Sequence, residues 1–109
     1  MTKGCYLKFY MQEATRLHGI LAYEWLLGKA ESIGIEGGTA FRAVAGFGRH
    51  HEMHMDQFFE LGGRLPVEVG FAVSDEHADR LLALLRDENV SLFFVRLPAE
   101  FGVTAAPRR

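Results

Sequence analysis

The middle of the chain carries side chains suited to binding an anion. Gly46 and Gly48 flank Phe47, and Arg49 follows directly. Glycines let a backbone pass close to a ligand, free N–H groups there can cradle an anion, and an arginine adds charge-assisted hydrogen bonds to phosphate or carboxylate. The pattern is therefore a candidate anion site at the end of a strand. The alternative is a plain bend beside a solvated arginine.

Three of the five histidines follow within five residues. They are His50, His51 and His54, beside Glu52. If this segment is a loop, two imidazoles and a carboxylate could meet one divalent metal. In an extended strand His51 and His54 would point to opposite faces, and a solvated, pH-sensitive loop is a further alternative. The metal hypothesis therefore stands beside the anion site.

Other reactive residue types have more ordinary explanations. Arg16 could meet an anion near a helix N-terminus and His18 could orient there, but a packing junction explains both equally well. We expect Trp25 in a core or interface and Cys5 buried inside a strand. The sequence contains no Gly-x-Ser-x-Gly elbow and no Walker loop. A non-catalytic protein is therefore expected.

The composition bounds the class of protein. The 109 residues, 49% hydrophobic and 24% charged, fit one globular domain over 1–109. A single cysteine excludes an internal disulfide and a multi-cysteine zinc site. The net charge of −2 does not favour nucleic acid as a partner. Because no apolar run approaches the ~18 residues of a membrane span and no signal-peptide layout is present, we expect a cytoplasmic protein.

Hydrophobic periodicity predicts the elements that must position these residues. Alternation of period two indicates strands, and apolar residues at i, i+3, i+4 and i+7 indicate helices. Ser74 is the expected N-cap of the second helix. The expected strands are 5–11, 39–46, 65–73 and 91–97, and Pro98 ends the last of them. The expected helices are 17–33, with an apolar stripe of Ile20, Tyr23, Leu27 and Ala30, and the segment from Ser74 to Leu85. Residues 53–61 are interpreted as an extended arm.

The order β-α-β-β-α-β predicts an α+β, ferredoxin-like fold. In that fold two helices cover one face of an antiparallel sheet and leave the other face open. Large side chains occupy both odd and even positions of the expected strands, so they point to both faces of the sheet and a monomer could not bury them all. They are Tyr6, Tyr10, Phe41, Phe93 and Phe94. A homo-oligomer that packs the open faces together is expected.

One run of residues resembles a known family. It reads Arg16-x-His18-Gly19, Tyr23-Glu24, Ala30, Gly34-Ile35-x-Gly37-Gly38-Thr39-Ala40-x-Arg42-x-Val44-Ala45-Gly46-Phe47-Gly48, His54 and Leu65-Pro66-Val67-x-Val69. The run is similar to a family of small PII-like proteins catalogued as domain of unknown function 190. The resemblance covers about residues 4–97 and leaves 98–109 as a frayed tail.

The resemblance implies a PII-like subunit within a homotrimer whose sheets face the three-fold axis. Proteins of the PII type bind adenine nucleotides in clefts between subunits. A loop after the second strand reports the ligand state by docking on a transporter, enzyme or regulator. The resemblance therefore implies a signalling protein that controls a partner through its 47–60 loop, and the expected partner is a membrane transporter or channel.

The resemblance also implies which residues bind. Gly46, Phe47, Gly48 and Arg49 are similar to the segment that opens the PII loop, where the arginine serves the phosphates. Arg42, in the same run, is assigned to this ligand site with them.

Two departures from the PII pattern alter the expected ligand. His50 stands where PII proteins carry a glutamine that helps to hold Mg-ATP and 2-oxoglutarate. The connection 86–91 is acidic and lacks glycine, where PII proteins have a glycine-rich phosphate loop. Two carboxylates there would repel a triphosphate, so a smaller or less charged ligand is expected. The alternative function is a divalent-metal-binding trimer that uses His50, His51 and His54.

Overall fold

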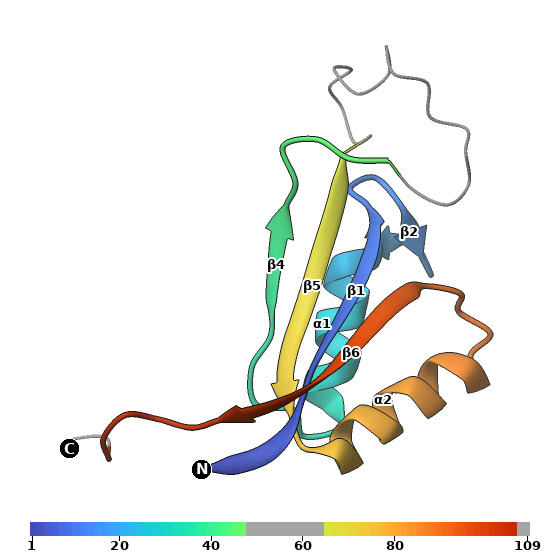
Figure 1. Ribbon diagram of the computed structural model, residues 1–109. Coiled ribbons are helices and arrows are strands. Elements are labelled where there is room, and N and C mark those ends of the chain that lie inside the picture. Colours follow the sequence, from blue (N-terminus) through green and yellow to red (C-terminus); the bar gives the residue numbers. More distant parts are fainter. Residues whose placement is uncertain (48–64, 107–109) are drawn as a thin grey trace.

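A computed structural model describes residues 1–47 and 65–106 (Figure 1). The described elements are β1 (Thr2–Gln12), β2 (Arg16–Leu17), β3 (Ile20–Leu21), α1 (Ala22–Ser32), β4 (Thr39–Arg42), β5 (Pro66–Val73), α2 (Asp75–Asp87) and β6 (Phe93–Phe101). Apart from the short pair β2 and β3, their order is the predicted β-α-β-β-α-β. The expected arm over 53–61 lies outside the described residues.

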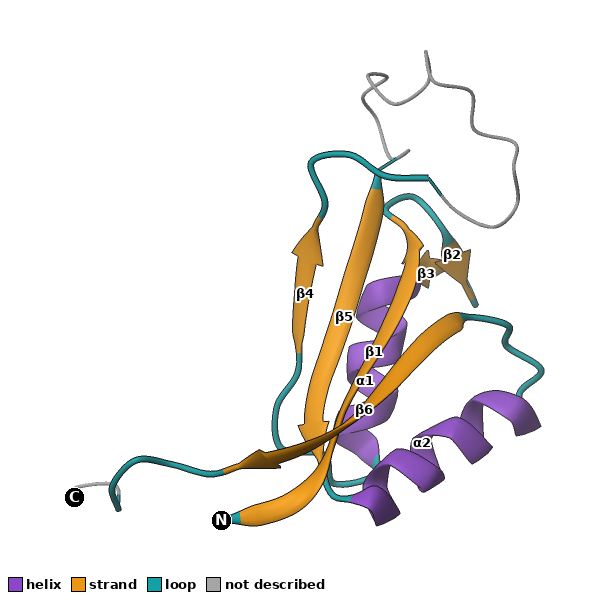
Figure 2. Ribbon diagram, viewed as in Figure 1, coloured by secondary structure: helices purple, strands orange, loops and turns teal. Residues whose placement is uncertain are grey.

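One antiparallel sheet organises the fold. Its strand order is β4-β5-β1-β6, and every neighbouring pair is antiparallel. Both helices lie on the same side of this sheet (Figure 2). The opposite side, called the outer face below, is covered by no described element of the chain. This two-layer arrangement confirms the predicted ferredoxin-like fold.

The hydrophobic core lies between the helices and the inner face of the sheet. In β1 every second residue, from Cys5 to Met11, is buried, as the alternating pattern predicts. Phe9 and Phe71 meet edge to face in the middle of the core, with ring centroids 6.2 Å apart. The helices contribute small and aliphatic residues together with one tryptophan: Ala22, Trp25, Leu26, Ala30, Ala78, Leu81 and Leu85.

The first helix begins later than predicted. Residues 17–21 belong to a hairpin of β2 and β3, and α1 begins only at Ala22. The hairpin turn is His18-Gly19, both with positive φ (53° and 85°), the backbone of a tight two-residue turn. Because the hairpin replaces the first helical turn, Ile20 is 44% exposed instead of joining the predicted buried stripe.

Two strand ends also differ from the prediction. β4 ends at Arg42 instead of residue 46, and β6 continues through Pro98 to Phe101. Pro98 is tolerated because β6 is an edge strand, and an edge strand can turn the missing N–H of a proline to solvent without losing a hydrogen bond to a neighbouring strand. Residues 98–101 therefore pair with the start of β1 and do not belong to a frayed tail.

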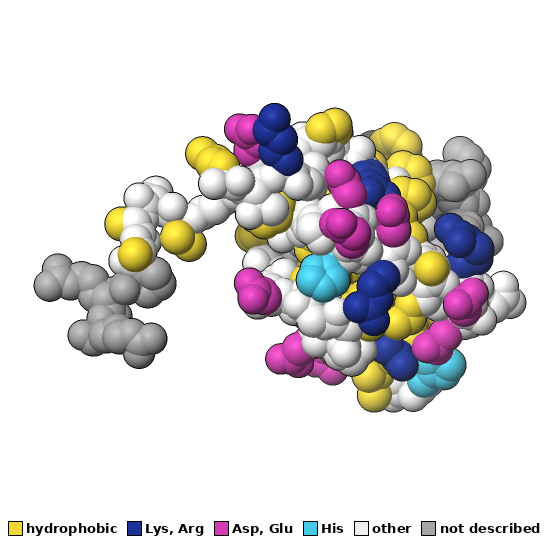
Figure 3. All heavy atoms as spheres, turned by 90° about the horizontal axis from the view of Figure 1, so that it is seen from below, with side chains coloured by type: hydrophobic (Ala, Val, Ile, Leu, Met, Phe, Trp, Pro, Cys, Tyr) yellow, Lys and Arg dark blue, Asp and Glu magenta, His cyan; other side chains and the backbone are white. Residues whose placement is uncertain are grey.

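The surface gives two further observations. Acidic and basic side chains are interspersed over the end of the molecule seen in Figure 3. That face therefore offers no single-sign patch of the kind that binds a phosphate backbone. In the described part of the chain, neither helix is long and apolar enough to cross a membrane.

An ion-pair cluster ties α2 to the edge of the sheet. The Arg96 guanidinium on β6 lies 2.8 Å from Asp79 Oδ1 and 2.9 Å from Asp75 Oδ1. Both carboxylates lie on the first turns of α2, where negative charge also favours the helix dipole. Hydrogen bonds to Asp75 and Asp79 raise the pKa of Arg96 above its usual range. This contact ties the N-terminal end of α2 to the middle of β6, where Arg96 pairs with Leu7 of β1.

The predicted N-cap of α2 is confirmed and can be tested. The Ser74 hydroxyl accepts a hydrogen bond from the His77 backbone N–H at 3.1 Å. Ser74→Ala should lower the free energy of unfolding by about 1 kcal/mol, because a helix N–H loses its acceptor. Ser32→Ala is the matched control, since the Ser32 hydroxyl only donates to the Lys29 carbonyl at an exposed helix end. Urea denaturation measures both; equal losses would contradict the capping role.

Candidate functional site

The base of the β4–β5 loop carries the predicted glycine motif. Beyond β4, the Ala43 N–H donates to the Pro66 carbonyl at 2.9 Å and holds the two ends of the loop together. A Cβ on Gly46 would lie 2.9 Å from Pro66 Cγ, so only glycine lets the chain pass this close to the proline ring. Phe47 follows and is 76% exposed. Gly48 lies outside the described residues, as do all residues through 64.

Arg42 lies beside this loop base and already has an acidic partner. Its guanidinium forms an ion pair with Glu13 at 2.5 Å, just after the end of β1. The Glu13 N–H in turn donates to the Leu65 carbonyl at 2.9 Å. The Arg42 side chain is 61% exposed, so it is accessible to a ligand that can share it with Glu13. Arg42, Gly46 and Phe47 are thus gathered at one end of the sheet, and the role of each in binding stays a prediction.

The remaining predicted site residues cannot be placed. Arg49, His50, His51 and His54 lie outside the described residues. Within 1–47 and 65–106, no group of three histidine, cysteine, aspartate or glutamate side chains could hold a metal ion. The metal hypothesis therefore rests on the loop histidines and stays a prediction.

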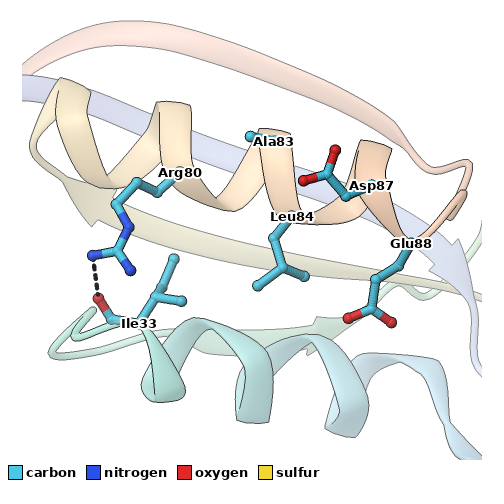
Figure 4. Close-up of a pocket in the computed structure, with 6 residues that line it drawn as sticks. All are labelled: Ile33, Arg80, Ala83, Leu84, Asp87 and Glu88. Atoms are coloured by element: carbon cyan, nitrogen blue, oxygen red, sulfur yellow. Dashed lines mark hydrogen bonds between the residues drawn. The ribbon is translucent and has the colours of Figure 1, made fainter.

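The acidic connection after α2 is less repulsive than its sequence suggests. Asn89 adopts a positive φ of 58°, which turns the chain after the helix without a glycine. The Glu88 carboxylate lies 3.3 Å from Lys29 Nζ and 3.5 Å from His18 Nε2, and the Lys29 ammonium on α1 partly offsets its charge. Glu88 and Asp87 both line a groove of about 460 Å³ between α1 and α2. Figure 4 shows this groove, with Glu88 extending toward α1.

The Arg16–His18 region proves to be a packing junction. The Arg16 guanidinium donates to the Gly19 carbonyl at 3.0 Å within the hairpin. The His18 ring lies against Trp25, with centroids 5.5 Å apart, and Trp25 is only 6% exposed. The Arg16 contact closes the hairpin, and the His18 contact seats the hairpin on α1. Cys5 is likewise buried, and burial raises the pKa of its thiol, which disfavours the nucleophilic thiolate.

The outer face of the sheet carries large apolar side chains exposed to solvent. Phe41 is 57% exposed, Phe93 49% and Leu97 46%, on β4 and β6. Tyr10 adds its ring beside Phe93 at a centroid distance of 5.9 Å. A Cβ on Gly70 would collide with the phenol of Tyr6, so glycine lets that ring lie flat across β5. Such a surface is typical of an interface.

The architecture is shared with PII-like signalling proteins. One solved structure is CPII, a nitrogen regulatory PII-like protein of Thiomonas intermedia K12 bound to ADP, AMP and bicarbonate. It superposes on this chain with a TM-score of 0.60 at 19% sequence identity, and the match covers 94% of this chain and 97% of CPII. A PII-like signalling protein of Thermus thermophilus gives 0.58 at 16% identity over 91% of both chains. These likenesses show a common fold.

The sequence itself defines the family. Residues 4–92 match domain of unknown function 190 (DUF190), described as Uncharacterized ACR, and the chain belongs to this family. A UPF0166 protein of Aquifex aeolicus is 33% identical over 86 residues, which are 79% of this chain and 82% of that protein. A UPF0166 protein of Methanocaldococcus jannaschii is 29% identical over 85 residues, 78% of each chain. The predicted family and its relation in fold to PII proteins are therefore confirmed.

Proposed function

We propose that this protein is a non-catalytic, cytoplasmic PII-like regulator that acts as a homotrimer. It binds a small ligand, an adenine nucleotide, at clefts between subunits and controls a partner through the loop that follows β4. The partner class we propose is a membrane transporter or channel. The observation that carries the proposal is the fold shared with PII-like signalling proteins, one of which was solved with ADP and AMP.

Two features of the described residues support this function. The outer face exposes Phe41, Phe93 and Leu97, which a trimer of inward-facing sheets would bury. The glycine motif begins where β4 and β5 are held together by the Ala43–Pro66 hydrogen bond, so a rigid scaffold carries the start of the loop. A ligand bound at this base could order or release the loop and so report its presence to the partner.

The ligand class is expected to be a mono- or diphosphate. Glu88 keeps a carboxylate close to the connection after α2, and that connection lacks the glycines of a phosphate loop. The pairing of Glu88 with Lys29 reduces this repulsion but leaves the connection acidic. Binding of AMP or ADP should therefore be tighter than binding of ATP.

Calorimetric titration of the metal-stripped protein tests the proposal. AMP, ADP, ATP and cyclic adenine nucleotides are titrated with and without magnesium, and saturable binding at one site per subunit is expected. Heat from Zn²⁺ or Ni²⁺ alone, abolished by replacing His51 and His54 with alanine, would instead favour the metal-binding alternative. No heat with any nucleotide would contradict the proposed ligand class.

The Arg49→Ala variant tests the assigned anion contact. Loss of one charge-assisted hydrogen-bonding side chain should weaken nucleotide binding about tenfold or more, while the size of the assembly stays the same. Arg80→Ala is the matched control, because Arg80 lies on α2 and donates to the Ile33 carbonyl, away from the loop base. Unchanged affinity in Arg49→Ala would remove the phosphate role of that arginine but leave the fold and assembly untouched.

A further inference from the structure

A second hollow lies on the β6 side of the connection after α2. It has a volume of about 320 Å³, within the range of small-molecule sites. At its floor Phe9 and Leu85 are buried, whereas Phe94 on β6 is 42% exposed beside them. The Phe9 and Phe94 rings lie 6.1 Å apart. The apolar residues that line it are Phe9, Leu82, Leu85, Val90, Leu92 and Phe94.

The polar residues that line this hollow carry no negative charge. They are Arg86, Asn89 and Ser91, and no acidic residue lines it. The connection divides its charges, because Asp87 and Glu88 line the α1–α2 groove on the other side. Within the described residues, the Arg86 guanidinium takes part in no hydrogen bond or ion pair. The hollow therefore combines an apolar floor with an unpaired cation and neutral hydrogen-bonding groups.

We propose that this hollow binds a small amphipathic carboxylate. The apolar body packs on Phe94 and on the partly buried Leu82, Val90 and Leu92, and it removes the exposed Phe94 ring from water. The carboxylate accepts charge-assisted hydrogen bonds from Arg86, with Ser91 as a further donor. The site lies on the helix side of the sheet and shares the connection after α2 with the proposed nucleotide site, but its ligand class follows from the hollow alone.

Octanoate is the probe for this site. The ¹⁵N-labelled full-length protein is titrated with octanoate, octanol and acetate, and amide chemical shifts are followed. We expect saturable shifts in residues 85–94 with octanoate, binding of octanol about tenfold weaker, and no saturation with acetate. Equal affinity for octanol would overturn the anion-binding role, and shifts confined to other parts of the chain would overturn the site.

Two variants locate the binding groups. Arg86→Gln should weaken octanoate about tenfold and leave octanol unchanged, because only the charge-assisted bonds are lost. Arg80→Gln is the matched control on the same helix, since Arg80 lines the other groove, and it should bind like the wild type. Leu82→Trp should fill the hollow and abolish binding of both probes. Equal weakening by the two arginine variants would overturn the proposal; nucleotide titration of Arg86→Gln tests the other site separately.

Discussion

Replacing Phe71 by alanine should lower the free energy of unfolding by about 3 to 5 kcal/mol. Phe71 lies in the middle of β5, is 1% exposed and packs edge to face on Phe9. Its ring also fills the space beside Gly38, where a Cβ would collide with it. The truncation therefore leaves a cavity between the sheet and the helices. A loss of this size is a large fraction of the ~5 to 15 kcal/mol that stabilises a typical domain.

Urea denaturation at one fixed subunit concentration measures this loss. Phe41→Ala is the matched control, because Phe41 lies on the outer face, 57% exposed, and the same atoms are removed without an internal cavity. Its direct effect on the subunit should stay below about 1 kcal/mol. If both variants lost the same stability in dilute, dissociated protein, the assignment of inner and outer faces would be wrong.

The sheet was predictable because its signal is local. The central strands β1 and β5 bury one parity against the helices, so Leu7, Phe9, Val67 and Val69 could be placed on the inner face from alternation alone. The helix start was not predictable in the same way. The tight turn requires a positive φ at His18, which is not a glycine. The His18 side chain contacts Trp25 and Glu88, and only the fold brings these residues next to it.

The candidate site was predictable only in part. The Gly46-Phe47 motif can be found from residue types, and the structure puts it where β4 leaves the sheet. The ion pair joins Arg42 of β4 to Glu13, which lies just after β1 and far earlier in the chain, so no local pattern could indicate it. Likewise, the sequence shows that 86–91 is acidic, but only the fold shows that Asp87 and Glu88 line one groove and Arg86 the other.

The two faces of the sheet divide the work of the domain. The inner face holds the subunit together through its core, and the outer face exposes apolar side chains that the proposed trimer would bury. If three outer faces meet, residues at the ends of the strands approach those of the next subunit. The loop base at Gly46 then becomes part of a cleft between subunits. Assembly and ligand binding are therefore expected to fail together when the outer face is disrupted.

Leu97→Asp tests that dependence directly. Leu97 is 46% exposed on the outer face and pairs with Tyr6 of β1. A carboxylate there would be buried without a partner in any assembly through this face, so the trimer should dissociate to monomers. Sedimentation velocity measures the assembly, circular dichroism checks the fold, and calorimetry should show nucleotide binding lost as well.

Ile20→Asp is the matched control for this variant. Ile20 is 44% exposed, nearly the same as Leu97, but it lies on the β2–β3 hairpin next to α1 and not on the four-stranded sheet. The same change of charge there should leave the trimer intact, because that hairpin is outside the proposed interface. A wild-type monomer, or a Leu97→Asp protein that keeps the wild-type size, would contradict assembly through the outer face. Nucleotide binding retained by a monomeric Leu97→Asp protein would place the ligand within one subunit instead of between two.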